Sequence, residues 1–117
     1  MIQMHQDLLA KAYAAFNTRN IDAALAVMHP DIEWANLMQG GHVHGHEAVR
    51  DYWTHQWSII NPHVEPKKFQ LDETGQIAVD VHLVVRDLDG NVMEDRMVQH
   101  IYIIKDDLIQ RMDIKES

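Results

Sequence analysis

Two side chains that can hold or move a proton, His100 and Tyr102, stand two residues apart in the run Val98-Gln99-His100-Ile101-Tyr102. In a strand, residues two apart point to the same side. An imidazole on an apolar sheet face can act as a general base or as a hydrogen-bond donor, and a phenol can donate to a negatively charged oxygen. Two plainer interpretations stay open: a core histidine satisfied by a neighbour, and a tyrosine whose hydroxyl lies in water at a rim.

A β-hairpin predicted over Ile77–Ile104 positions both side chains. Its turn is predicted at Asp89-Gly90, because Asp-Gly between two alternating, β-branched-rich runs favours a type I′ turn, in which both central residues need a positive φ. With Leu88 opposite Asn91, the register is fixed along the whole hairpin. The pairs are then Val85 with Glu94, Leu83 with Arg96, Val81 with Val98, Val79 with His100, and Ile77 with Tyr102.

One face of this hairpin is more apolar than the other and is expected to point inward. That face carries Ile77, Val79, Val81, Leu83, Val98, His100 and Tyr102. The opposite face holds Val84, Met97 and Ile101 among polar residues, and it would leave apolar area exposed on a chain of this size. We therefore expect a homodimer that pairs through the sheet.

The last turn, Lys105-Asp106-Asp107, decides which residue of the final predicted strand, Leu108–Ile114, lies beside His100. A tight two-residue loop would place Asp113 there and give a carboxylate–imidazole pair. A one-residue bulge would instead turn Gln110, Met112 and Ile114 inward. Without a neighbouring carboxylate, burial should lower the pKa of His100.

The composition is that of an ordinary globular protein, with 46% apolar and 24% charged residues in 117. We expect one α+β domain over residues 1–117. The formal charge of −8 disfavours nucleic acid and anionic membranes. The absence of cysteine excludes disulfides, thiolate zinc sites and a cysteine nucleophile. No signal-peptide pattern and no apolar run of roughly 18 residues is found, so a cytoplasmic location without membrane contact is expected.

The spacing of apolar residues changes between a helical and a strand period along the chain, which predicts the order of the elements. Asn20 is a plausible N-cap of the second helix, and Pro66 with Lys67-Lys68 is typical of an edge strand. The expected elements besides the hairpin are helices over Met4–Asn17, Ile21–Met28 (ended by Pro30) and Glu47–Ile60, and strands over Ile32–Leu37, Val64–Leu71 and Leu108–Ile114. Helices first and a mostly antiparallel sheet afterwards indicate an α+β domain.

Several short sequence patterns lie at the starts of these elements and in the turns between them. They are Asn20-Ile21-Asp22-Ala23-Ala24, Met28-His29-Pro30-Asp31-Ile32-Glu33-Trp34, Gly45-His46-Glu47-Ala48-Val49-Arg50-Asp51-Tyr52-Trp53, Asp87-Leu88-Asp89-Gly90-Asn91 and Asp107-Leu108-Ile109. Together with the order of elements, they resemble the SnoaL-like and ketosteroid-isomerase-like members of the nuclear-transport-factor-2-like superfamily. The resemblance covers nearly the whole chain and specifies fold far better than activity.

The resemblance implies a cone: three N-terminal helices packed on a curved, mostly antiparallel sheet around an apolar cavity, often as a dimer. It also implies that Met112 points inward. The general-base Asp of the isomerases falls at Trp34, their oxyanion-stabilising Tyr falls next to Tyr13, and their protonated Asp falls at His100. The Asp-Arg-Asp arrangement of epoxide-hydrolase members is not reproduced by Asp80, His82 and Asp113.

The function expected from these observations is binding of a hydrophobic small molecule. As a cofactor-free isomerase, cyclase or hydratase-like lyase, the protein would act on a carbonyl compound, with His100 and Tyr102 as catalytic residues. The expected ligand-binding residues are Tyr13, Phe16, Trp34, Trp53, Val79, Val81, Val98 and Met112. The alternative is a non-catalytic ligand-binding or dimerisation module of the same fold. We expect no metal, since no Asp or Cys completes a ligand set near His42-Val43-His44-Gly45-His46.

Overall fold

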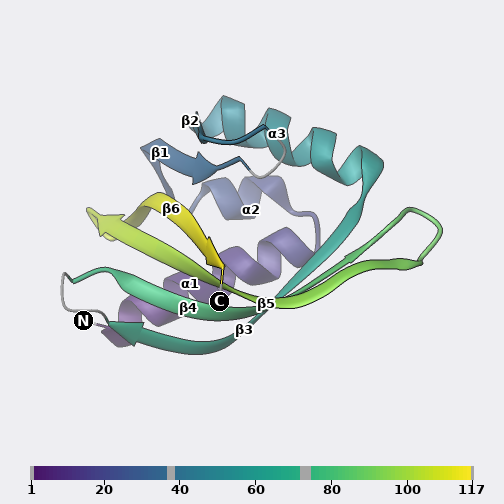
Figure 1. Cartoon of the computed structure of the whole chain (residues 1–117). Helices are drawn as coiled ribbons and strands as arrows, with labels where there is room; N and C mark the ends of the chain where they lie inside the picture. Colours follow the sequence, from purple (N-terminus) through teal and green to yellow (C-terminus); the bar gives the residue numbers. More distant parts are fainter. Residues whose placement is uncertain (1, 37–38, 72–74, 117) are drawn as a thin grey trace.

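The computed structural model describes residues 2–36, 39–71 and 75–116. Within these residues the helices are α1 (Ile2–Asn17), α2 (Ile21–Leu25) and α3 (His46–Ile59), and the strands are β1 (Met28–Ala35), β2 (His42–His44), β3 (Asn61–Leu71), β4 (Ile77–Arg86), β5 (Val92–Lys105) and β6 (Leu108–Glu116). Figure 1 shows the helices along one side of a curved sheet, with the β4–β5 hairpin extending past them at one end.

The strands form one open sheet in the order β2-β1-β6-β5-β4-β3. Strands β1 and β6 pair in parallel, and the other neighbours are antiparallel. Several register shifts interrupt the ladders, and such bulges bend a strand and increase its twist. The predicted α+β cone is therefore confirmed, with β3 at a sheet edge as its proline and lysines indicated.

The long hairpin that carries His100 and Tyr102 has the predicted register. Val85 lies opposite Glu94, and the pairing continues without a shift to Ile77 opposite Tyr102. The face predicted to point inward is buried at every position, and His100 itself is 7% exposed. The alternation of apolar and polar residues is thus sufficient to place both candidate side chains on the inner face.

The turn of this hairpin differs from the prediction. Gly90 has a positive φ of 93°, whereas Asp89 keeps a negative φ, so the turn is not type I′. The Gly90 amide donates to the Asp87 carbonyl at 3.1 Å, and the Asp87 amide donates to the Asn91 carbonyl at 2.9 Å. This is a three-residue loop with glycine in the left-handed position. A bulge at Met93 restores the predicted register beyond it.

The last hairpin combines the two alternatives that the sequence left open. Asp106 and Asp107 form a tight turn with φ values of 55° and 61°, and a bulge follows at Gln110. Gln110 itself does not point inward, as the bulge alternative had predicted, because its side-chain amide donates to the Asp31 carbonyl at 3.4 Å. The bulge changes which residues of β6 face the helices.

Beyond the bulge, Met112 lies opposite Tyr102 and Ile114 lies opposite His100. Met112 is 1% exposed, as expected from the family resemblance. Asp113 pairs with Arg111 on the outer face, so this carboxylate does not lie beside His100. The bulge therefore gives His100 the apolar Ile114, and not Asp113, as its partner across the ladder.

The second helix is shorter than predicted. Asn20 does cap it, because its side-chain oxygen accepts from the Ala23 amide at 3.2 Å. The helix ends at Leu25, however, and Pro30 lies inside β1 rather than at a helix end. The reason is tertiary: Met28 is 1% exposed and pairs with β6, so burial and strand pairing override helical periodicity. Leu37, the predicted end of this strand, lies outside the described residues.

Candidate functional site

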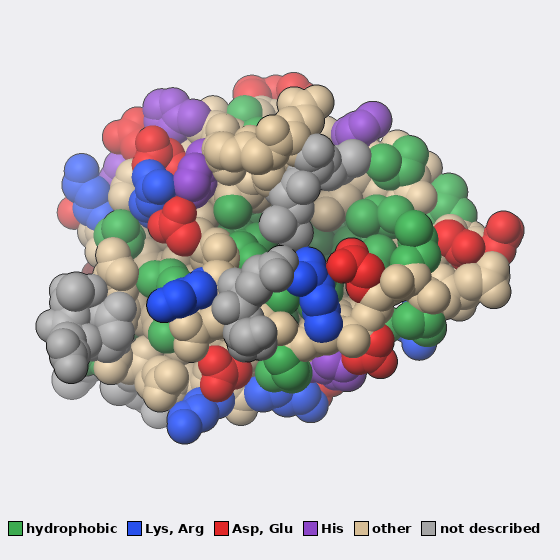
Figure 2. Space-filling view, viewed as in Figure 1, with side chains coloured by type: hydrophobic (Ala, Val, Ile, Leu, Met, Phe, Trp, Pro, Cys, Tyr) green, Lys and Arg blue, Asp and Glu red, His purple; other side chains and the backbone are tan. Residues whose placement is uncertain are grey.

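A cavity of about 210 Å³ opens between the helices and the inner face of the sheet. Its walls come from α1, α3 and the strands β1, β3, β4, β5 and β6, and most of the lining side chains are apolar. Figure 2 shows a hollow between α3 and the β4–β5 hairpin, with hydrophobic side chains inside it and charged side chains at its edge. Its polar lining side chains are Tyr13, Tyr52, Gln56, Glu94, Arg96, His100 and Tyr102.

Three of these polar side chains form a buried hydrogen-bonded chain. The Tyr102 hydroxyl donates to the Tyr13 hydroxyl at 2.7 Å, and the Tyr13 hydroxyl lies 2.8 Å from Nδ1 of His100. The Tyr13 ring also stacks on the imidazole at an interplanar angle of 10°. Tyr13 comes from α1 and the other two residues come from β5, so the chain joins helix to sheet.

The hydrogen-bond directions indicate which nitrogen of His100 carries its proton. Tyr13 accepts from Tyr102, so its own hydrogen is free to be donated to Nδ1 of the imidazole. If Nδ1 were protonated instead, it would donate to Tyr13 and Tyr13 would donate to Tyr102. The hydrogen of the Tyr102 hydroxyl, in a side chain that is 1% exposed, would then have no acceptor among the described residues. The satisfied arrangement is a neutral ring with its hydrogen on Nε2. No protein group in the described part of the chain bonds to that nitrogen.

Burial sets the charge state of all three groups. It lowers the pKa of His100 to about 4, because the imidazolium would lose its hydration in an apolar site. Burial also raises the pKa of Tyr13 and of Tyr102 above the ordinary value. At neutral pH the network is therefore an uncharged imidazole held by two uncharged phenols.

Aromatic rings form the wall between α1, α3 and β1. The Trp53 ring meets Phe16 at 5.0 Å and Trp34 at 5.3 Å, both nearly edge to face, which is a favourable aromatic arrangement. Next to them on α3, Gln56 lines the cavity at 8% exposure. In the part of the chain that the structure describes, its carboxamide has no hydrogen-bond partner. The wall thus offers broad apolar contact and one adaptable polar group.

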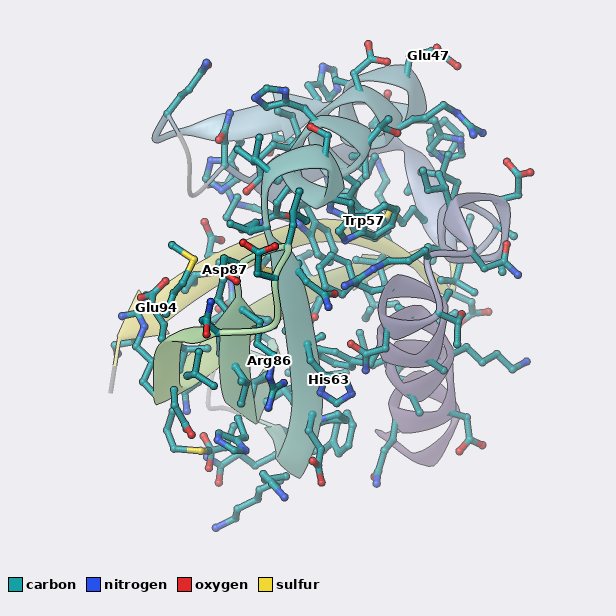
Figure 3. The ribbon with its side chains drawn as sticks, turned by 90° about the vertical axis from the view of Figure 1, so that its right-hand side faces the viewer. Glu47, Trp57, His63, Arg86, Asp87 and Glu94 are labelled. Carbon is teal, nitrogen blue, oxygen red and sulfur yellow. The ribbon has the colours of Figure 1, made fainter. Side chains whose placement is uncertain are left out.

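The mouth of the cavity lies at the tip end of the hairpin. Glu94 and Arg96 line it from β5 and form an ion pair of 3.2 Å. Figure 3 views this end of the molecule, where Trp57 projects from α3 toward the interior. The charged groups of the cavity are therefore at its entrance, and its base is apolar apart from the histidine–tyrosine network.

The sequence profile of the SnoaL-like domain matches residues 9–112, which is most of the chain. The chain belongs to the SnoaL-like domain family. The resemblance seen in the sequence is thereby confirmed. No curated protein matches the sequence.

Solved structures share the fold of this SnoaL-like chain at low sequence identity. TerC, co-crystallised with polyporic acid, is 23% identical at a TM-score of 0.84, over 97% of this chain and 92% of TerC. A nuclear-transport-factor-2-like protein from Burkholderia pseudomallei is 20% identical at 0.82, over 97% and 91% of the two chains. A Mycobacterium tuberculosis protein in complex with estradiol-17beta-hemisuccinate is 15% identical at 0.79, over 93% and 90%.

Most of the residues expected at the site of this SnoaL-like protein line the cavity. These are Tyr13, Phe16, Trp34, Trp53, Val98, His100, Tyr102 and Met112. Val79 and Val81 do not line it, although both are fully buried on the inner face. The reason is position along β4: the cavity is lined by Leu83 and Val85, nearer the hairpin tip. The two valines instead belong to the closed core.

The sequence patterns did not indicate four polar residues of the cavity, Tyr52, Gln56, Glu94 and Arg96. The signal for the two charged residues was present, because the alternation that places Val98 and His100 inward also places Arg96 and Glu94 on that side. Gln56 lies three residues after Trp53 on the same helical face. A polar residue in an apolar stripe was the signal for this position.

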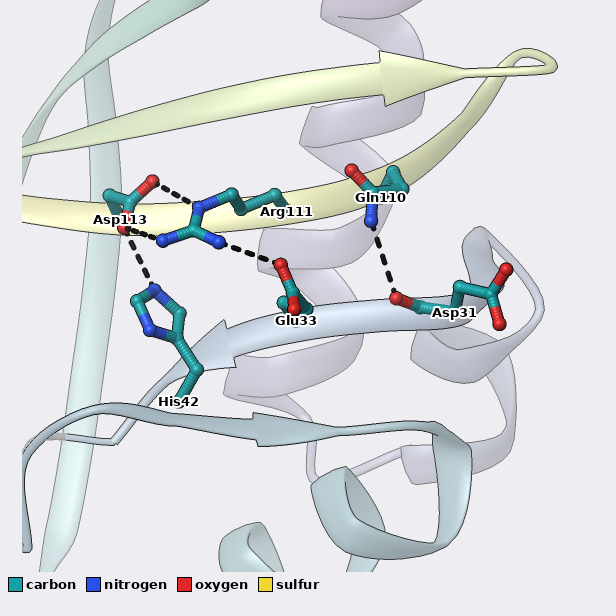
Figure 4. A network of polar contacts seen from close by, with 6 residues as sticks. All are labelled: Asp31, Glu33, His42, Gln110, Arg111 and Asp113. Carbon is teal, nitrogen blue, oxygen red and sulfur yellow. Dashed lines mark hydrogen bonds and ion pairs between the residues drawn. The ribbon is translucent and has the colours of Figure 1, made fainter.

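A carboxylate–guanidinium–carboxylate arrangement across adjacent strands does occur in the SnoaL-like chain, but on the outer face of the sheet. Figure 4 shows Arg111 between Glu33 of β1 and Asp113 of β6. Arg111 donates to Glu33 at 2.6 Å and to both oxygens of Asp113 at 2.9 and 3.2 Å, which holds the pKa of Asp113 below its ordinary value. His42 lies 2.8 Å from Asp113. This network joins β2, β1 and β6 and lies outside the cavity.

The histidines of the run His42-Val43-His44-Gly45-His46 have different partners in the structure. His42 contacts Asp113, whereas His46 donates to the Met28 carbonyl at 2.9 Å. Within the described residues, no three His, Asp or Glu side chains are arranged to hold a metal. None of the helices in the described residues is long and apolar enough to cross a membrane.

The buried state of His100 predicts a pH dependence of stability. The unfolded chain binds a proton at the ordinary histidine pKa of 6.5, and the folded protein binds it only near pH 4. As the pH falls from 6.5 to 4, proton binding therefore favours the unfolded state, by up to about 3 kcal/mol. Wild type should lose this free energy of unfolding relative to His100→Gln, which keeps an acceptor for Tyr13 but does not titrate. Urea unfolding of both proteins across this range measures the difference, and parallel curves would contradict the burial of a neutral imidazole.

Proposed function

We propose that this chain binds a small hydrophobic molecule bearing a carbonyl or hydroxyl oxygen, and that the N–H of His100 donates a hydrogen bond to that oxygen. The observation that carries the proposal is the Tyr102–Tyr13–His100 chain, because it leaves a protonated Nε2 without a protein acceptor in an otherwise apolar cavity. The ligand-bound states of TerC and of the Mycobacterium tuberculosis protein support a small-molecule role for this cavity.

The network favours polarisation of a carbonyl over transfer of a proton through the tyrosines. A proton passed from Tyr102 through Tyr13 to His100 would leave a buried phenolate, which the raised pKa of Tyr102 opposes. A fixed N–H aimed at a carbonyl oxygen instead stabilises the negative charge that develops on enolisation. This is the chemistry of an isomerase or cyclase that acts without a cofactor.

The alternative is a module that binds the same ligand without turnover. One observation favours it: among the described residues that line the cavity, Glu94 at the mouth is the only carboxylate. The family resemblance also implies that Trp34 stands where the isomerases have their general base. Removal of a proton from carbon needs a base near that carbon. The two candidates therefore share the binding site and differ only in whether a base is present.

The bicyclic ketone alpha-tetralone tests both candidates. We expect it to bind, with its carbonyl stretch shifted to lower frequency, and His100→Leu to abolish the shift and weaken binding about fivefold, the loss of one neutral hydrogen bond. Calorimetry and infrared spectroscopy measure the two effects. Val79→Ala, a change in the closed core, is the matched control and should retain the shift.

Exchange of the ketone's alpha hydrogens in deuterated water then separates an enzyme from a binding module. Exchange that is faster than in buffer and lost in His100→Leu supports catalysis, and binding without exchange supports the alternative. An unshifted carbonyl in the wild-type complex would contradict the proposed role of His100.

We also propose that residues 1–117 form one domain, because the buried hydrophobic residues make a single cluster. Two copies are proposed to pair through the outer face of the sheet. On that face Met97 is 43% exposed, and Val84 and Ile101 are half-buried on the same pair of strands. Burial of these side chains against a second copy would remove apolar area from water.

Light scattering at tens of micromolar protein should therefore give a dimer mass. A charge at the pairing face opposes association, so Met97→Asp should shift the mass toward a monomer. Leu88→Asp, at an exposed position in the hairpin loop, should leave the dimer intact. A monomer mass for the wild type would contradict pairing through this face.

A further inference from the structure

A carboxamide interrupts the aromatic and aliphatic face that α3 turns toward the cavity. Tyr52, Trp53, Gln56 and Ile60 all line the cavity, and their spacing is that of one helical face. Gln56 lies within this face and is 8% exposed. A methionine or leucine at this position would complete the hydrophobic face, so packing alone does not account for a glutamine here.

The carboxamide of Gln56 has no hydrogen-bond partner in the part of the chain that the structure describes. A carboxamide offers one acceptor and two donors, and burying them without partners destabilises a fold. The N–H at Nε2 of His100 also has no partner among the described residues. The cavity therefore contains two buried polar groups whose partners have to come from the molecule that fills it.

These two groups lie on opposite walls of the cavity. Gln56 belongs to α3, and His100 belongs to β5 in the sheet that the helices cover (Figure 1). A row of aromatic rings connects the walls: the Trp53 ring lies 5.3 Å from Trp34, and Trp34 lies 6.3 Å from Tyr102. All three rings line the cavity. A flat, apolar ligand can pack on this row and present one polar group at each end.

The size and charge of the site limit what the second polar group can be. The cavity of about 210 Å³ is smaller than the roughly 300–1,000 Å³ of pockets for drug-sized ligands, so one or two rings fit it. A hydroxyl is the smallest group that can both donate to and accept from a carboxamide. A carboxylate would lose its hydration at Gln56 without meeting a positive charge from that side chain.

We propose that the ligand is a neutral hydroxy ketone of one or two rings, whose hydroxyl pairs with the Gln56 carboxamide while its carbonyl accepts from His100. This inference rests on the proposed function and adds the chemical class of the ligand and a residue that selects it. A ketone without the hydroxyl leaves the carboxamide unpaired. A site built around such a polar group discriminates against the analogue that lacks its partner.

Alpha-tetralone and its derivative with a hydroxyl group para to the carbonyl differ by this one group and test the inference. Wild type should bind the hydroxylated ketone about fivefold more tightly, the gain of one neutral hydrogen bond. Gln56→Met keeps the length of the side chain and removes the carboxamide. In this variant the order of the two affinities should reverse, because the hydroxyl would be buried without a partner. Calorimetric titration measures all four affinities.

The stability of the variants separates a ligand contact from a structural role. Because no described protein group bonds to the carboxamide, Gln56→Met and Gln56→Leu should keep or raise the Tm. A large drop in both variants would show that the carboxamide supports the fold and would overturn its assignment to the ligand. Gln70→Met is the matched control: it makes the same change at an exposed position of β3 and should leave the preference for the hydroxylated ketone unchanged.

Two kinds of failure can be told apart. Equal binding of the two ketones by wild type, or a preference that survives in Gln56→Met, would overturn the role of Gln56. The proposed function would still stand if the carbonyl stretch of bound alpha-tetralone were shifted. Failure of wild type to bind either ketone would overturn the proposed function itself.

Discussion

The hydrogen bond between Tyr13 and His100 is the interaction on which the cavity depends. It joins α1 to β5 across the interior and fixes the orientation of the imidazole. The Tyr13 hydroxyl accepts a hydrogen bond from Tyr102 and donates one to Nδ1 of His100. A buried polar network of this kind is favourable only when each member is satisfied. The N–H at Nε2 of His100 has no partner within this network, so it is available to donate a hydrogen bond to a ligand.

The surroundings of this network are set by a local irregularity of the sheet. The bulge at Gln110 turns Met112 and Ile114 inward and Asp113 outward. With Asp113 on the inner face, the imidazole would have an anionic neighbour, and its proton would be retained at higher pH. With the bulge, that carboxylate is paired with Arg111 on the outer face, and Ile114 lies opposite the histidine. One extra residue in β6 thus keeps the Asp113 carboxylate away from the buried histidine.

The fold and the inner face of the hairpin could be predicted from the sequence. Both follow from the periodicity of apolar residues and from the turn residues that separate the elements. The register from Val85 to Tyr102 was correct even though the turn was not, since the three-residue loop is compensated by the bulge at Met93. The bulge at Gln110 was one of two predicted alternatives, and no local pattern could choose between them. The end of α2 was missed for a different reason, because the pairing of Met28 with β6 is a long-range contact.

For the site, alternation placed His100, Tyr102 and Val98 correctly on the cavity side, but it could not show how far the cavity extends along β4. Val79 and Val81 were expected to contact ligand and lie in the closed core instead. The hydrogen-bond partner of His100 could also not be predicted from the sequence. Tyr13 lies 87 positions away, and only the packing of α1 against the sheet brings its hydroxyl to Nδ1.

We infer that His100 is neutral, with Nδ1 as acceptor and the hydrogen on Nε2 available to a ligand. Long-range proton–nitrogen NMR correlation of the imidazole measures this state directly, and His100→Gln identifies the signal. At neutral pH we predict a Nδ1 shift typical of an unprotonated, hydrogen-bonded nitrogen and a Nε2 shift typical of a protonated one, with the Nε2 proton moving downfield on addition of alpha-tetralone. A ring protonated on both nitrogens, or on Nδ1 alone, would contradict the account.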